Sequence, residues 1–180
     1  MTLRPKASLA LAVAVVVTAA AAAIAVAAGS GANSTADAAR ATARFRNLTV
    51  AKRAGYGLLK DKKGIACIAM DSMPEMGAMG VHYAKGPLVG DGKLDVVTPE
   101  ALVYSPEGGK LRLAAVEYVV LKSAWKARHS SAPVLFGRRF NFTPAGNRFG
   151  LPAYYSLHVW LFKRNPAGKF SMWNPEVHCR

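Results

Sequence analysis

Residues 100–121, EALVYSPEGGKLRLAAVEYVVL, contain two strand-like runs separated by a turn. The runs 100–104 and 111–121 are rich in aliphatic, aromatic and β-branched residues, which favour strands. The six residues between them, SPEGGK, have the composition of a turn. We therefore expect an antiparallel hairpin here.

The second run of this hairpin is almost entirely apolar, so its one acidic residue, Glu117, is expected to lie inside the protein. If Tyr104 faces Leu111, then Glu100 faces Ala115 and shares a sheet face with Glu117. A slip of one residue in the register would remove that relationship.

The segment 154–163, YYSLHVWLFK, predicts another strong strand near the C-terminus. Strict alternation would place Ser156, His158 and Trp160 on one face of it. Shorter strands are expected at 65–70, 79–84 and 134–142. The segment 39–54 predicts a helix with an apolar face that includes Phe45 and Leu48, and Gly55 is its candidate C-cap. Together these patterns predict an α+β fold, a curved antiparallel sheet of about five strands packed by an N-terminal helix.

The N-terminal segment 1–28 has the pattern of a signal peptide. Two basic residues, Arg4 and Lys6, precede an uncharged run of alanine and valine that extends from Ala7 to Ala28. Retention of this run as a membrane anchor is the alternative. We expect a disordered leader over 29–38, a single domain over 39–180, and a monomer that is secreted or resides in the periplasm or cell envelope, with no membrane contact after cleavage.

Export determines how the two cysteines are interpreted. In an oxidising compartment a pair of cysteines is expected to form a disulfide, and Cys67 and Cys179 are the only pair in the chain. This bond would hold the C-terminal tail beside the segment that follows Cys67.

The chain is strongly basic, with 24 Lys and Arg residues against 10 Asp and Glu residues. Loss of Arg4 and Lys6 with the leader lowers the formal net charge from +14 to +12. This charge favours an anionic polymer of the envelope as a partner. The basic residues are scattered and do not alternate with aromatic residues, so we expect no nucleic acid partner.

Several short motifs resemble a family of short exported bacterial proteins that has no assigned function. The motifs are MGVHY at 79–83, PEALVY at 99–104, VEY at 116–118, LHVW at 157–160, NPAG at 165–168 and WNP at 173–175. The resemblance covers nearly all of the mature chain and implies no activity. The histidine motif and the first cysteine are usual in that family, whereas Met70, Met73 and Met76 are particular to this chain.

Two groups of residues are candidate metal sites. In the first, Met70, Met73, Met76 and Met79 recur at every third position before His82, and thioethers with an imidazole suit Cu(I). The alternative is that these methionines fill gaps in a loop, because Pro74, Gly77 and Gly80 interrupt regular structure.

The second group comprises His82, Glu100, Glu117 and His158. Two imidazoles with one or two carboxylates could hold Zn(II), Fe(II) or Mn(II) and leave a position open for substrate. The alternative is a core hydrogen bond between His158 and a buried Glu117. Sequence motifs of common enzyme classes, such as GxSxG and HExxH, are missing.

The sequence therefore predicts an exported protein that binds a metal ion, with copper or zinc as candidates, or a small ligand. Two alternatives stay open, a metal-dependent enzyme centred on His82, Glu117 and His158, and a basic module that binds anionic wall polymer.

Overall fold

The computed structural model describes residues 1–2 and 34–179, and the residues 34–179 belong to one compact unit. The predicted signal peptide, apart from residues 1–2, and the first half of the predicted leader, residues 29–33, lie outside the described residues. The elements are α1 (Thr35–Thr42), a 3-10 helix η1 (Ala43–Arg46), α2 (Leu48–Arg53), β1 (Gly57–Leu58), β2 (Cys67–Ala69), a 3-10 helix η2 (Pro74–Met76), β3 (Ala78–Ala84), α3 (Gly86–Val89), β4 (Ala101–Glu107), β5 (Lys110–Leu121), α4 (Lys122–Lys126), β6 (Val134–Leu135), β7 (Arg138–Arg139), β8 (Asn141–Thr143) and β9 (Tyr154–Trp160).

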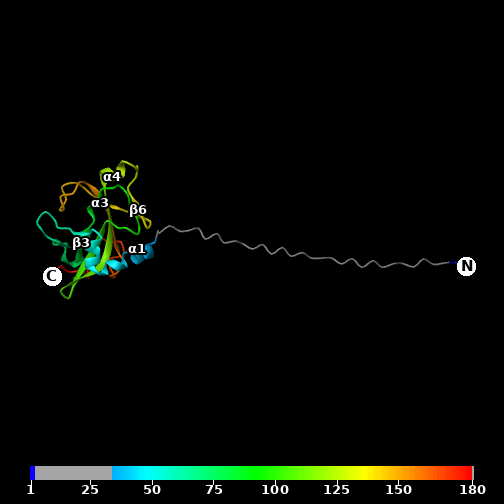
Figure 1. Cartoon of the computed structure of the whole chain (residues 1–180), viewed down its shortest axis with the longest axis horizontal. Helices are drawn as coiled ribbons and strands as arrows, with labels where there is room; N and C mark the ends of the chain where they lie inside the picture. The colour runs from blue at the N-terminus through cyan, green and yellow to red at the C-terminus, as the bar shows by residue number, and fades with distance from the viewer. Residues whose placement is uncertain (3–33, 180) are drawn as a thin grey trace. The chain divides into compact units, whose positions relative to one another are not determined.

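The centre of the fold is an antiparallel sheet with the strand order β1-β3-β4-β5-β9-β8, in which β2 also pairs with β3. Figure 1 colours these strands by their position in the chain. The predicted α+β class, the antiparallel sheet, the N-terminal helix and the disulfide are all confirmed. The sheet has seven strands where we expected about five. The additional strands are short, because β1 and β8 contain only two and three residues.

The N-terminal helical segment begins earlier than predicted and is interrupted. The Ser34 hydroxyl accepts a hydrogen bond from the Asp37 N–H and the Asp37 carboxylate accepts one from the Ser34 N–H, a capping box that starts α1 at Thr35. The last part of the predicted leader, Thr35–Ala38, is therefore helical. Asn47 caps α2 through the Thr49 N–H and separates it from η1.

The central hairpin forms as predicted, but its turn is tighter and its register differs. Gly108 and Gly109, both with positive φ, make the turn between β4 and β5, so the residues before them extend β4. Tyr104 pairs with Leu113, not with Leu111, and the register shifts between Val103 and Tyr104. The predicted register was wrong because the strands continue into the turn and one carries a bulge.

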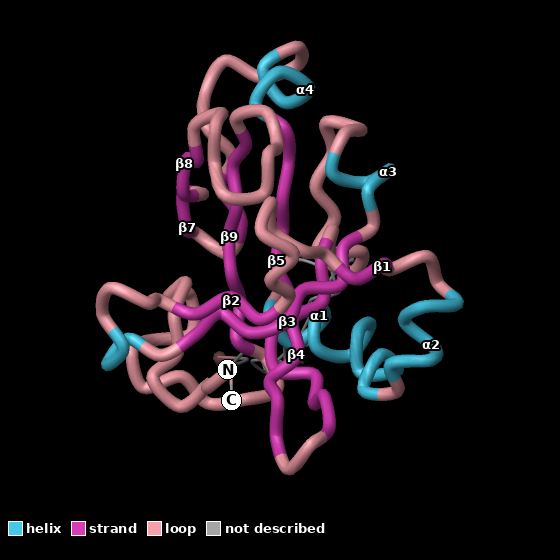
Figure 2. Tube along the Cα trace, turned by 90° about the vertical axis from the view of Figure 1, so that its left-hand side faces the viewer, coloured by secondary structure: helices cyan, strands magenta, loops and turns pink. Residues whose placement is uncertain are grey.

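The two faces of the sheet have different coverings. On one face, Tyr83, Tyr104 and Tyr118 join the main core, to which the N-terminal helical segment contributes Phe45 and Ala51. Helices α1 and α2 lie together on one side of the sheet (Figure 2). Alternation places the neighbours of these core residues, including His82 and Glu117, on the opposite face.

The C-terminal segment covers part of that opposite face. Asn174 exchanges two backbone hydrogen bonds with Ala78 at the start of β3, and Val177 is fully buried in a smaller cluster that includes Trp160. The Cys67–Cys179 disulfide fixes the end of this segment to β2. Gly77 has φ +72, and a Cβ atom there would clash with the backbone carbonyl of Asn174. The contact between the two segments therefore depends on a glycine.

None of the helices in the described part of the chain combines the length and apolar character that crossing a bilayer requires.

Candidate functional site

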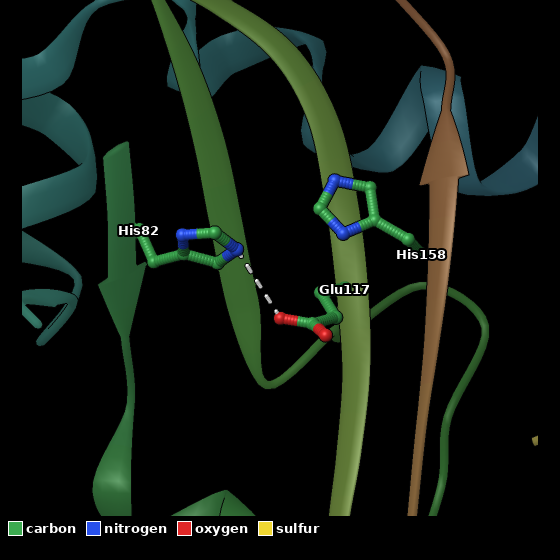
Figure 3. Close-up of side chains that lie close together, drawn as sticks. All are labelled: His82, Glu117 and His158. Atoms are coloured by element: carbon green, nitrogen blue, oxygen red, sulfur yellow. Dashed lines mark ion pairs between the residues drawn. The ribbon is translucent and has the colours of Figure 1, made fainter. Parts of the chain in front are cut away.

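Three titratable side chains from three strands meet on the face opposite the N-terminal helices. His82 lies on β3, Glu117 on β5 and His158 on β9, and each offers a ligand atom within 4.8 Å of those of the other two. Glu117 and His158 are direct cross-strand partners. On β4, His82 pairs with Val103 and Glu117 pairs with Ala101, so His82 and Glu117 approach each other diagonally across this strand (Figure 3). Strand alternation and the pairing of β3, β4, β5 and β9 therefore bring the three side chains together.

The cluster is buried, and its imidazoles have few partners. His82 and His158 are each 1% exposed and Glu117 is 7% exposed. None of the four ring nitrogens of His82 and His158 has a hydrogen-bond partner among the described residues. A buried polar atom without a partner costs about 1–3 kcal/mol of stability, and such atoms are uncommon in native proteins. This arrangement is therefore unusual for a purely structural core.

The one close contact within the cluster joins His82 Nε2 to Glu117 Oε2 at 3.4 Å, too poorly aligned for a hydrogen bond (dashed in Figure 3). His158 does not hydrogen-bond Glu117, and its ring stacks on Trp160 with centroids 4.9 Å apart. The sequence-based alternative of a hydrogen bond between His158 and Glu117 is therefore wrong. Within the described part of the chain, neither nitrogen of His158 has a hydrogen-bond partner.

The protonation states follow from burial and from neighbouring charges. Burial lowers the pKa of His158 to about 4; the Glu117 carboxylate opposes this shift and His82 adds to it. Burial alone would raise the pKa of the Glu117 carboxyl, but the His82 and His158 imidazoles and the Ser156 hydroxyl hold this pKa below its usual range. At neutral pH the cluster therefore presents a carboxylate and a neutral His158 imidazole, the forms that bind metal ions.

Glu100, the fourth residue predicted for this group, lies elsewhere. Since Ala101 pairs with Glu117, Glu100 comes next to Tyr118 and on the opposite side of the sheet from Glu117. Its carboxylate accepts a hydrogen bond from the Val119 N–H at 2.9 Å. Burial raises the pKa of Glu100 to about 8, although that hydrogen bond lowers it. Glu100 is therefore a buried structural carboxyl and not a member of the cluster.

The methionines of the first predicted group have different environments. Met79 is 7% exposed in β3, Met73 is 41% exposed, and Met70 and Met76 are half-buried. The Met70 sulfur accepts a hydrogen bond from the Ser72 hydroxyl. Their spacing of three therefore gives no common face, because they are distributed over a turn, a 3-10 helix and a strand.

The other two histidines lie outside the cluster. His129 stacks on Trp125 with ring centroids 3.6 Å apart. His178 is exposed, beside the disulfide, and lines an open pocket with Met70 and Asp71.

An apolar pocket of about 250 Å³ adjoins the cluster. Its lining residues come from β3, β4, β5 and three separate loops or short helices: Leu59, Ala84, Gly86, Val89, Gly90, Ala101, Glu117, Val119, Leu121, Leu151 and Pro152. Glu117 is the one ionisable group among these described residues. No sequence pattern indicates this pocket, because its walls come from segments far apart in the chain.

The donor set fits a divalent transition metal. Zinc–nitrogen and zinc–oxygen bonds of about 2.0–2.2 Å place the donor atoms of a tetrahedral site about 3.3 Å apart. The His82–Glu117 distance of 3.4 Å already meets this requirement. The ligand atoms of all three residues lie within 4.8 Å of one another, so His158 would have to approach the other two to complete a tetrahedral site. Neither imidazole has a protein acceptor among the described residues for its second nitrogen. The cluster therefore lacks the outer hydrogen bonds that strengthen many metal sites.

Comparisons with protein-family models, with curated proteins and with solved structures give no match to this chain.

Proposed function

We propose that this protein binds a divalent transition-metal ion through His82, Glu117 and His158. The observation that carries the proposal is the convergence of three buried ligand groups, two of which are imidazoles without hydrogen-bond partners among the described residues. Two imidazoles and one carboxylate are a donor set used for Zn(II), and also for Fe(II) and Mn(II). A bound cation would satisfy one nitrogen of each ring and compensate the buried negative charge.

This proposal favours the second predicted group over the methionine group. Cu(I) prefers thioethers and thiolates, and carboxylates are poor ligands for it. Both cysteines are in the disulfide, and the four methionines range from buried to exposed. Two imidazoles and a carboxylate suit harder ions, so zinc is a better candidate than copper.

Export of the protein to the cell envelope belongs to the same proposal. The disulfide indicates an oxidising environment outside the cytoplasm. The leader-like sequence at 1–28 and the resemblance to exported bacterial proteins point to the same location. A metal site made of histidine and carboxylate remains usable there, since neither group is lost to oxidation.

The test is metal analysis of protein purified from an exporting host without chelator. We expect about one zinc, iron or manganese ion per chain. After removal of the metal, zinc titration of His158→Ala and Glu117→Gln should show affinity losses larger than the roughly 10–100-fold that follows removal of an outer-shell partner. His129→Ala is the matched control, because His129 lies outside the cluster.

Two results would contradict the proposal. One is a protein that takes up none of these ions even when they are supplied in excess. The other is Cu(I) bound at full stoichiometry by wild type and by Glu117→Gln alike, which would move the site to the methionines.

A further inference from the structure

The apolar pocket beside the cluster suggests what the metal site would accept as a ligand. Ala84, Ala101 and Val119 line it, and all three lie on the same sheet face as His82 and Glu117. The pocket and the three proposed metal ligands therefore lie on the same face of the sheet, and Glu117 belongs to both. The inference below rests on the proposed metal site.

The size and lining of the pocket limit the ligand. A volume of about 250 Å³ corresponds to roughly eight water molecules at about 30 Å³ each, and thus to a ligand of roughly eight non-hydrogen atoms. Leu59, Val89 and Leu121 supply aliphatic walls, and Glu117 is the one ionisable group that the described lining residues provide. A ligand that fits these walls is apolar along most of its length and polar at one end.

Charge balance identifies the polar end. A divalent ion held by two neutral imidazoles and one carboxylate leaves one uncompensated positive charge in a buried place. Buried charge is costly unless it is paired. An anionic oxygen donor on the ligand would neutralise this charge, whereas a neutral donor would not.

We propose that the metal site and the adjoining pocket together bind a small aliphatic monocarboxylate, with its carboxylate on the metal ion and its hydrocarbon tail in the pocket. About four or five tail carbons, together with the three atoms of the carboxylate, make up the roughly eight non-hydrogen atoms that correspond to the pocket volume. Without the metal ion the same carboxylate would meet the charge of Glu117 and be repelled. Binding therefore requires both the ion and the tail.

The test compares hexanoate with acetate, which has the same head and almost no tail. Calorimetric titration of the zinc-loaded protein should give hexanoate an affinity at least about tenfold higher than that of acetate, since each buried methylene favours binding. The visible spectrum of cobalt-loaded protein should change with both ligands, because both carboxylates reach the ion. Metal-stripped protein should bind neither ligand.

Two variants of the short helix α3 provide a matched pair. Val89 lines the pocket and Leu88 does not, so Val89→Trp should fill the tail site and abolish the preference for hexanoate. Leu88→Trp should retain the preference. Zinc content measured for both variants shows whether the metal site is intact.

Three outcomes would overturn this inference while the metal proposal stands. They are equal affinity for acetate and hexanoate in zinc-loaded protein, a hexanoate preference that survives in Val89→Trp, and binding of hexanoate to the stripped protein as tightly as to the loaded one. A protein that loads no metal at all overturns both proposals, and the elemental analysis distinguishes that case.

Discussion

Glu117 is buried between two imidazoles, which favour its ionised form. Burial of this charge costs stability. Replacement of a buried ionic group and its partner by apolar residues of similar size is often neutral or stabilising, whereas removal of one partner is destabilising. Natural proteins retain such groups where function requires them. The cluster therefore predicts a conflict between stability and function.

The double variant His82→Leu/Glu117→Leu tests this conflict. In the presence of chelator we expect it to be as stable as wild type or more stable, by up to about 4 kcal/mol, because unpartnered polar atoms are replaced by apolar ones. Glu117→Ala alone should be less stable than wild type, since it leaves a cavity. Urea unfolding monitored by fluorescence gives these free energies. A double variant several kcal/mol less stable than metal-free wild type would show that the cluster is a structural element.

Glu100 predicts a pH dependence of stability that is separate from the metal site. Its pKa is about 8 in the folded protein and has an ordinary value of 4.5. Between these values the folded chain holds a proton that the unfolded chain releases, so this contribution to stability is complete below about pH 4.5 and is lost as the pH rises to about 8. His158 acts in the opposite direction, but only between about pH 4 and its ordinary pKa of 6.5.

The variant Glu100→Gln isolates this effect, because its amide oxygen can still accept the hydrogen bond from the Val119 N–H. At pH 8 we expect Glu100→Gln to be more stable than wild type by on the order of a few kcal/mol. Below pH 4.5 the difference should shrink toward zero. Free energies of unfolding measured at several pH values between 6.5 and 8.5 should fall for wild type and stay level for the variant. Parallel curves would mean that Glu100 is already ionised in the folded state.

At the scale of elements, the contact between the C-terminal segment and the start of β3 depends on Gly77. A Cβ atom there would clash with the Asn174 carbonyl, and φ is +72. Gly108 in the β4–β5 turn also has positive φ, +55, but has open space around its Cβ position. An alanine would therefore have a strained backbone at either position, but its Cβ atom would clash with a neighbour only at position 77.

We expect Gly108→Ala to cost about 1–2 kcal/mol of stability, the strain of a left-handed non-glycine residue. Gly77→Ala should cost clearly more, because the C-terminal segment must also move away from β3. Denaturant unfolding of both variants gives the comparison. Equal losses would indicate that this segment yields at little cost.

Much of the sheet was predictable from the pattern of single strands. Alternation in 154–160 placed His158 on a face with Ser156 and Trp160, and the apolar run around Glu117 predicted its burial. Glu100 could not be placed in the same way, because its face depends on a register that a bulge shifts. The methionine spacing could not place the four sulfurs relative to one another, since a period of three has a structural meaning only within a regular element.

The break in the N-terminal helix and the walls of the pocket were harder to predict, for different physical reasons. The capping box at Ser34 and the cap at Asn47 are local, and side-chain patterns such as S-x-x-D could have located the first of them. The pocket joins Leu59, Val89 and Leu151, which are far apart in the chain. Only the tertiary structure brings such residues together.

At the scale of the whole molecule, the positive charge of +14 still predicts attraction to anionic polymers. Several basic side chains pack on aromatic rings. Arg46 lies over the ring of Phe162, and Arg138 lies over the ring of Phe170. Cation–π contacts of this kind stabilise exposed aromatic surface by about 0.5–1 kcal/mol each. Part of the basic character is therefore explained by packing.

The disulfide connects the stability of the molecule to the proposed metal site. It joins residues 112 positions apart and holds the C-terminal segment against the face that carries the cluster. Trp160, which stacks on His158, also packs against Val177 in the smaller hydrophobic cluster. Release of the tail should therefore loosen the support of one metal ligand as well as the fold.

For the double variant Cys67→Ser/Cys179→Ser we expect a loss of about 2–4 kcal/mol in the free energy of unfolding. We also expect weaker zinc binding, because His158 would be less restrained. The control is Glu117→Gln, which should weaken zinc binding while the disulfide stays in place. Urea unfolding and zinc titration on the same preparations separate the two effects. If the serine variant loses stability but binds zinc with wild-type affinity, the support that the tail gives to the metal site is disproved, and the disulfide serves the fold alone.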